Sequence, residues 1–371
     1  MKYGFLFIAL GIILSLVAFV IIRGWQALPA QGFSRMLYVG LSIALFVAFI
    51  ATMIFGQKMP LGLASDLSFA GNSYLIILIY LLFSFILADV IRMSNYFVHF
   101  APAGMHSFRF WWMMGSLVVI AVAMIFGNIK FNHPETVSLN IEVAKPKQNG
   151  TLKIVAASDL HLGFSIDKKM LRRYVEMINA QKPDIVLLAG DVSDRPIEPL
   201  IRQNMEEEFR AIKAPLGVYA IEGNHELYTE TPNATAVYLR KSGIVVLQDS
   251  VCLVNNAFYI IGRKDYSNPQ RKPLSELVSN LNPDLPKILL DHQPHHLEEA
   301  SKLNIDLQIS GHTHEGQFFP GNLFVKRMFE LGYGYMKKGN THYYVSSGLG
   351  IWGPQYRIGT QSELVVIKMK Y

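Results

Sequence analysis

Four stretches in the first third of the sequence are uncharged and apolar over about the length that a helix needs to cross a bilayer. They cover residues 4–22, 36–56, 67–88 and 110–129. A hydrocarbon core about 30 Å thick is crossed by about 20 helical residues. The sequence therefore predicts four transmembrane helices in residues 1–129 of a multi-pass protein of the cell membrane. Four spans place both ends of this bundle on one side of the membrane.

The first stretch has an alternative interpretation as a cleaved signal peptide, because Lys2 precedes an apolar run. No small-residue cleavage site follows closely, and three more apolar stretches do, so we favour a span. Aromatic residues that suit the membrane interface lie near the ends of the stretches, at Trp25, Tyr96, Trp111 and Trp112.

The loop charges bear on the orientation of the bundle. The two loops on one side hold Arg23, Arg35, Arg92 and Arg109, whereas the other side holds only Lys2 and Lys58. Positively charged loops stay in the cytoplasm, which favours an extracytoplasmic C-terminal half. Three lysines after the last stretch, at 130, 145 and 147, oppose this, so the side stays open. Asp89, three residues before Arg92, is better explained as an interfacial ion pair than as a proton relay.

Most of the net charge of +6 lies in the first 149 residues, which include the membrane part of the chain. Residues 1–149 carry nine basic and four acidic side chains, and residues 150–371 are almost neutral, with 25 and 24. The second part therefore lacks the basic excess of a nucleic-acid-binding domain, and we expect no nucleic-acid partner. Cys252 is the single cysteine, which excludes an intramolecular disulfide and a thiolate metal cluster.

The pattern changes after the last apolar stretch. Residues 130–150 suit a linker with one entering strand, and residues 151–371 alternate short β-branched runs with helix-like segments such as 167–180 and 197–213. A hairpin turn is expected at Asn255 and Asn256, and a final strand at 363–370. This alternation predicts an α/β domain with a largely parallel sheet.

Five of the predicted strands end in polar residues. The runs are "LKIVAASD", "PDIVLLAGD", "GVYAIEGNH", "KILLDH" and "DLQISGHTH". In an open α/β sheet the ligand site lies outside the carboxyl ends of the strands, so we expect the residues that end these runs to converge. They are Asp159, His161, Asp191, Asn224, His225, Glu226, His292, His312 and His314.

These residue types suit a metal centre. Carboxylate, imidazole and amide oxygen bind borderline divalent ions such as Mn, Fe and Zn, and a central carboxylate can bridge two of them. We expect the spacing of two in Asp159-x-His161 and His312-x-His314 to place both side chains on one side of an extended chain. Two ions about 3.5–4 Å apart provide an activated hydroxide for phosphoester hydrolysis. Any one of these histidines alone would more often be an ordinary polar residue, and Asp159 or Asp191 alone a helix cap.

The motif series resembles the calcineurin-like metallophosphoesterase family. The matching residues are "DLH" at 159–161, "GD" at 190–191, "GNHE" at 223–226, "DHQP" at 291–294 and "GHTH" at 311–314. The resemblance covers residues 150–371 and implies a two-sheet α/β sandwich with a binuclear metal centre. It implies that Asp159, His161, Asp191 and His314 bind one ion, and that Asp191, Asn224, His292 and His312 bind the other. It also implies that His225 contacts the phosphate and assists the leaving group.

Two departures from the family pattern limit what the resemblance implies. "VSDRP" follows Asp191 in place of the arginine-rich continuation of the protein phosphatases, which disfavours a phosphoprotein substrate. The chain is closer to compact bacterial members, some of which act on lipid-linked or nucleotide phosphoesters. Glu226 replaces the commoner aspartate, and we expect it to orient a metal ligand. His295 and His296 begin a predicted helix and are not expected to bind metal.

Two further interpretations compete with that of an active membrane-anchored phosphoesterase. One is a membrane sensor or scaffold with a non-catalytic metal-binding domain, which is disfavoured because every expected ligand is present. The other is a transporter, which is disfavoured by the few spans and their low polarity. Residues 316–339, rich in aromatic residues and lysine, form either a loop with one short helix packed on the domain or a rim against the bilayer that admits a phosphorylated lipid.

Overall fold

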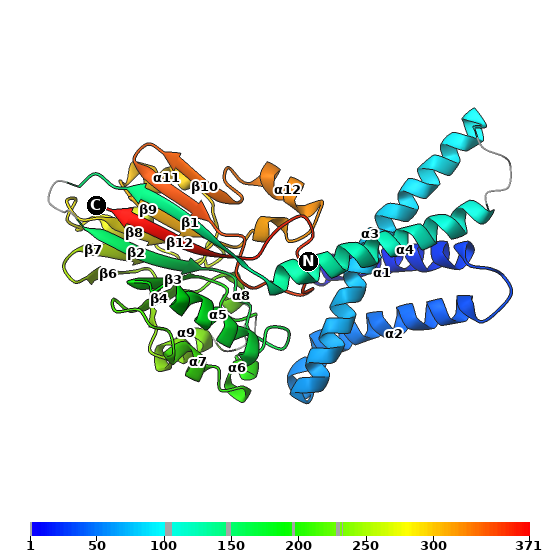
Figure 1. Cartoon of the computed structure of the whole chain (residues 1–371), viewed down its shortest axis with the longest axis horizontal. Helices are drawn as coiled ribbons and strands as arrows, with labels where there is room; N and C mark the ends of the chain where they lie inside the picture. The colour runs from blue at the N-terminus through cyan, green and yellow to red at the C-terminus, as the bar shows by residue number, and fades with distance from the viewer. Residues whose placement is uncertain (1, 101–105, 146–149, 195–196, 228–230, 232) are drawn as a thin grey trace. The chain divides into compact units, whose positions relative to one another are not determined.

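The computed structural model describes residues 2–100, 106–145, 150–194, 197–227, 231 and 233–371, without the side chains of 2–10 and 106 (Figure 1). Residues 146–149 of the predicted linker, residues 195–196 of "VSDRP" and the side chain of Lys2 lie outside this set. The chain divides into two compact units, Met1–Phe126 and Gly127–Tyr371.

The first unit is built from four helices. They are α1 (Lys2–Ala27), α2 (Ser34–Phe55), α3 (Leu61–Val98) and α4 (His106–Asn132), with a short 3₁₀ helix at Gly56–Lys58. In the described part of the chain, α2, α3 and α4 are long and apolar enough to cross a membrane, and α1 contributes a shorter apolar segment, Gly11–Ala27. Each predicted apolar stretch thus lies within one helix, except that Gly56, the last residue of the second, begins the 3₁₀ helix.

Small and hydroxyl-bearing residues hold these helices together. A side chain at Gly71 of α3 would come within 2.6 Å of the Phe49 backbone of α2, so only glycine permits this approach. Between α3 and α4, the Ser84 hydroxyl lies 2.8 Å from the Trp112 indole nitrogen and 2.6 Å from the Ser116 hydroxyl. Such contacts are typical of helix pairs in a membrane, where apolar burial does not drive association.

The second unit contains two six-stranded mixed sheets. The first has the order β1 (Glu135–Glu142), β12 (Glu363–Lys370), β2 (Thr151–Ala157), β3 (Ile185–Ala189), β4 (Val218–Ile221), β5 (Val245–Val246). The second has the order β10 (Gly334–Lys338), β11 (Thr341–Val345), β9 (Leu307–Ser310), β8 (Lys287–Leu290), β7 (Phe258–Gly262), β6 (Ser250–Val254). The strands that precede the predicted site are parallel within each sheet: β2 to β4, and β8 with β9.

An apolar core between the sheets contains residues of both, including Ile154, Leu187, Ile288 and Ile309. Helices α5 (Lys168–Ala180), α6 (Glu198–Arg202), α7 (Glu206–Arg210) and α9 (Ala234–Lys241) pack on the first sheet. Helices α10 (Leu274–Val278) and α11 (Leu297–Lys302) pack on the second. Burial on both faces explains why the central strands read as continuous apolar runs.

The predicted hairpin turn is present, whereas the helix expected over 197–213 and the linker expected over 130–150 differ from the structure. The predicted turn residues Asn255 and Asn256 have left-handed φ of 48° and 54° and lie in the three-residue loop between β6 and β7. The helix expected over 197–213 is two short helices, α6 and α7, separated by Asn204 with φ of 48°. The predicted linker 130–150 contains the end of α4 and strand β1, which pairs with β12 along its whole length. The sheets are mixed but largely parallel, as expected: only β12 with β2, and each end strand of the second sheet with its neighbour, pair antiparallel among the described strands.

Candidate metal centre

The residues that end the five predicted strands meet at one place. Those from β2, β3 and β4 belong to the first sheet and those from β8 and β9 to the second, so the site lies where the carboxyl ends of both sheets come together. The Nε2 atom of His292 is 3.1 Å from Oδ2 of Asp191, although 101 positions separate the two residues. The convergence expected from the sequence is present, but two sheets produce it.

Two groups of side chains could each hold a metal ion. Asp159, His161 and His314 form one, and Asp191, His292 and His312 form the other; within each, the ligand atoms lie within 4.8 Å of one another. A third combination joins His161, Asp191 and His225. Most of these residues are almost completely buried, and His225 and His312 are partly exposed.

Asp191 lies between the two groups. Its Oδ2 atom is 3.7 Å from Nε2 of His161 and 3.1 Å from Nε2 of His292, and its Oδ1 accepts a 2.9 Å hydrogen bond from the backbone N–H of His225. Burial alone would raise the pKa of Asp191, but His292 and His161 outweigh it and lower the pKa. The carboxylate is therefore ionised, in the form that binds cations.

Two of the histidines, His292 and His312, have orientations that suit metal ligands. Nδ1 of His292 is 2.7 Å from the Ala189 oxygen, which directs its buried Nε2 towards the Asp191 carboxylate. Burial and the charge of His292 lower the pKa of His312 to about 3. His312 is therefore neutral at physiological pH, as metal binding requires. Its Nδ1 is 2.8 Å from the Asn224 amide oxygen, so both side chains face the same point. This donor set fits a divalent ion.

The backbone at the site differs from the extended chain that the spacing of two suggested. Strand β2 ends at Ala157 and β9 at Ser310, so both pairs of site residues lie in the loops beyond the strands. Asp159, His161, His312 and His314 have φ between 46° and 72°. The strand-based explanation was therefore wrong: left-handed residues separated by one position direct the side chains. This conformation costs an L-residue about 1–2 kcal/mol and is often retained at functional sites.

Two glycines, Gly223 and Gly311, each precede one candidate ligand and leave room for the carboxylate of another. A side-chain carbon at Gly223 would lie 2.2 Å from Oδ1 of Asp191, and one at Gly311 would lie 2.3 Å from Oδ2 of Asp159. Side-chain carbons do not approach other heavy atoms so closely without a covalent bond. The two carboxylates therefore depend on the absence of these side chains.

Glu226 holds the loops around Asp191. Its two carboxylate oxygens accept hydrogen bonds from the backbone N–H groups of Asp191, Ser193 and Gly223 at 3.2, 2.9 and 2.7 Å. Burial and the neighbouring charge of Asp191 raise the pKa of Glu226 to about 8. The residue contacts the backbone of one candidate ligand and not its side chain, an arrangement compatible with the orienting role expected from the sequence.

Asp194 is a site residue that the sequence reasoning missed. Its backbone oxygen and Oδ1 lie 2.5 and 3.1 Å from Nδ1 of His225, and Oδ1 is 3.6 Å from Nδ1 of His161. Burial lowers the pKa of His225, but the bonds to Asp194 and the charge of Asp191 raise it to about 9. His225 is thus a cation at neutral pH. A second acid three residues after Asp191 was the available signal, within "GDVSD".

Arg357 was also missed, and no nearby motif indicates it. The side chain is completely buried and donates hydrogen bonds to the carbonyl oxygens of His314, Ser347, Gly348 and Gly350. The Gly350 backbone N–H in turn donates to the Asp159 carbonyl oxygen. Arg357 therefore fixes the loops that carry two site residues.

The dependence on Gly223 gives a testable prediction. Replacement of Gly223 by alanine should displace the Asp191 carboxylate and lower the metal content of the purified full-length protein severalfold, as measured by inductively coupled plasma mass spectrometry. Gly163→Ala is the matched control, because its added carbon would lie 3.6 Å from Asp194, an ordinary contact. Equal metal content in both variants would contradict the role assigned to the close approach.

Comparisons with known proteins agree with this geometry. Residues 152–316 match the calcineurin-like phosphoesterase family. The chain is 32% identical over 262 residues to an uncharacterized metallophosphoesterase of Campylobacter jejuni, and the match covers 69% of each chain. It is 31% identical over 273 residues to a transmembrane protein with a metallophosphoesterase domain from Danio rerio, covering 69% of this chain and 62% of the other.

A third relative matches almost over its whole length. It is an uncharacterized metallophosphoesterase of Aquifex aeolicus, 31% identical over 262 residues, with 67% of this chain and 98% of the relative covered. The motif series, the two mixed sheets and these similarities lead to one conclusion. The chain belongs to the calcineurin-like phosphoesterase family of metal-dependent phosphoester hydrolases.

Proposed function

We propose that the chain is a membrane-anchored phosphoesterase whose site binds two divalent ions. Asp159, His161 and His314 would hold one ion, and Asn224, His292 and His312 the other, with Asp191 shared between them. The observation that carries this proposal is the position of Asp191, whose Oδ2 faces a histidine of each group at 3.7 and 3.1 Å. Two such ions would supply an activated water and neutralise charge on the phosphate.

The protein side chains would position the substrate and move the proton. His225 is cationic and partly exposed, with Asp194 holding its Nδ1. A cation in this position can contact a phosphate oxygen and donate a proton to the leaving alkoxide. After donation, the Asp194 contact would keep the ring oriented, so that reprotonation returns the same geometry. These roles for His225 and Asp194 belong to our proposal.

The first test is hydrolysis of a chromogenic phosphodiester by the full-length protein with added manganese. His225→Ala should lower the rate at least about 100-fold, because the proton donor is lost. The same variant should retain its metal, since Asp191 accepts from the His225 backbone N–H, which alanine keeps. Asp191→Asn should lose both activity and metal.

The rival function is a membrane sensor or scaffold whose metal site does not turn over. It predicts no hydrolysis by the wild-type protein with any added Mn, Fe or Zn. His296→Ala provides a matched control, because this histidine is 62% exposed and belongs to neither ligand group. A loss of activity in His296→Ala equal to that in His225→Ala would contradict the proposed roles.

The membrane anchor would consist of all four N-terminal helices. Three meet the length and composition of a span, and α1 contributes Gly11–Ala27 among the residues with described side chains. With both ends of the bundle on one side, the arginines near the α1–α2 and α3–α4 connections favour cytoplasmic loops and an extracytoplasmic phosphoesterase domain. The relative from Danio rerio, named as a transmembrane protein, supports the anchoring but not the side.

The substrate class that we propose is a phosphoester with a lipid portion. Helix α12 (Gly321–Met328), labelled in Figure 1, belongs to the second unit. It has no buried residue, and Leu323, Phe324 and Met328 are 55%, 64% and 75% exposed. Lys326 and Arg327 lie in its last turn. A short amphipathic helix with apolar and basic residues is suited to the interface of an anionic bilayer.

This helix adjoins the candidate metal centre within the same unit. The ring of Phe329, the residue after α12, lies 6.4 Å from that of His312 and 5.2 Å from that of His295. The Thr313 hydroxyl, between two site histidines, donates a 2.5 Å hydrogen bond to the Gly332 oxygen. An amphiphile held by α12 would therefore have its phosphate near His312.

A double variant tests the lipid part of the proposal. Leu323→Ser with Phe324→Ser should lower turnover of a long-chain phosphoester in mixed micelles roughly tenfold, because apolar area at the interface is lost. Turnover of a short-chain, soluble phosphoester should not change. Val237→Ser, in an exposed position of α9, is the control. Equal turnover of both substrates by wild type and the double variant would refute the lipid preference and leave the hydrolase activity intact.

A further inference from the structure

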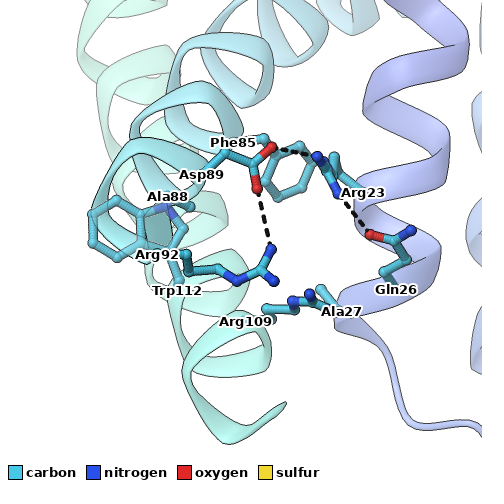
Figure 2. A pocket seen from close by; sticks show the side chains of 9 residues that line it. All are labelled: Arg23, Gln26, Ala27, Phe85, Ala88, Asp89, Arg92, Arg109 and Trp112. Atoms are coloured by element: carbon cyan, nitrogen blue, oxygen red, sulfur yellow. Dashed lines mark hydrogen bonds and ion pairs between the residues drawn. The ribbon is translucent and has the colours of Figure 1, made fainter. Parts of the chain in front are cut away.

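A basic recess lies at one end of the helical unit, where α1, α3 and α4 meet (Figure 2). We call it the basic recess because three guanidinium groups line it, those of Arg23, Arg92 and Arg109. They belong to three different helices. Phe85 and Trp112 form part of its apolar lining. The recess is formed entirely within the first unit and is not part of the candidate metal centre.

The recess carries more positive than negative charge. Asp89 is the acid in its lining, and its two oxygens lie 2.6 Å from Arg23 and 3.2 Å from Arg92 (Figure 2). Among the described residues, Arg109 forms no ion pair with a carboxylate and experiences the like charges of Arg92 and Arg23. One carboxylate therefore faces three guanidinium groups, which leaves an excess of two positive charges.

The three helices contribute to the recess near their ends. Arg23 lies in the last turns of α1, Arg92 in the last turns of α3, and Arg109 in the first turn of α4. The long apolar part of each of these helices extends away from the recess in one direction along the chain: before Arg23 in α1, before Arg92 in α3 and after Arg109 in α4. In a bilayer the recess would therefore lie at the depth of the headgroups. The exposed Trp25 and Trp111 near the same helix ends suit that depth.

We propose that the basic recess binds the phosphate group of an anionic phospholipid. Guanidinium groups match the geometry of phosphate oxygens, and the excess of two charges matches a phosphomonoester such as phosphatidic acid. The apolar lining suits the glycerol and the first carbons of an acyl chain, and basic pockets between membrane helices bind lipid headgroups in this way. The inference requires the membrane insertion proposed above and is independent of hydrolysis at the metal centre.

Native mass spectrometry of the full-length protein, released from micelles that contain phosphatidic acid and phosphatidylcholine, tests this binding. Wild type should retain phosphatidic acid in preference to phosphatidylcholine. Arg109→Gln should retain about fivefold less, the expected effect of one arginine near a headgroup. Arg35→Gln is the matched control, because Arg35 starts α2 and donates to the Leu28 oxygen outside the recess lining.

A second variant and a competitor separate the remaining outcomes. Asp89→Asn removes the counter-charge and should increase retention of phosphatidic acid. Millimolar inorganic phosphate should not displace the lipid, because the apolar lining contributes to its binding. Equal retention by wild type and Arg109→Gln, or displacement by inorganic phosphate alone, would overturn the proposal. Hydrolysis of a soluble phosphodiester by Arg109→Gln should match wild type, so failure of the lipid site and failure of the phosphoesterase function are distinguishable.

Discussion

The placement of the Asp191 carboxylate is the constraint on which the candidate metal centre depends. Its Oδ1 accepts from the backbone N–H of His225, and its Oδ2 lies 3.1 Å from His292 and 3.7 Å from His161, one histidine of each candidate group. The missing side chain of Gly223 leaves the space, and Glu226 ties the surrounding backbone together. A buried carboxylate with this much adjacent positive charge is stable as an anion. Divalent ions would take the place of that positive charge.

The parts of the fold that local patterns determine were predictable from the sequence. Strands β2, β3, β4, β8 and β9, the turn at Asn255 and Asn256, and helix α5 with its Asp167 cap follow from apolar runs and turn or cap residues. All nine polar residues at the predicted strand ends are in or beside the site. Their division between two sheets was implied only by the family resemblance, because periodicity does not say which strands pair.

What the sequence did not indicate depends on tertiary contacts. The left-handed φ of Asp159 and His161 is imposed by hydrogen bonds such as those of their N–H groups to Gly190 and Asp191. Asp194 follows a ligand in an ordinary loop, and its importance appears only when His225 lies beside it. Arg357 donates hydrogen bonds to carbonyl groups of segments that are distant in the sequence, and no spacing rule connects these segments.

The central claim, that Asp191 joins two metal ions, is tested most directly by electron paramagnetic resonance of the full-length protein loaded with Mn²⁺. We expect the spectrum of a spin-coupled pair at two equivalents, since the ions would lie about 3.5–4 Å apart. His314→Ala and His312→Ala should each give the spectrum of an isolated ion, by emptying different halves of the site. An isolated-ion spectrum for the wild-type protein at two equivalents would contradict the shared position of Asp191.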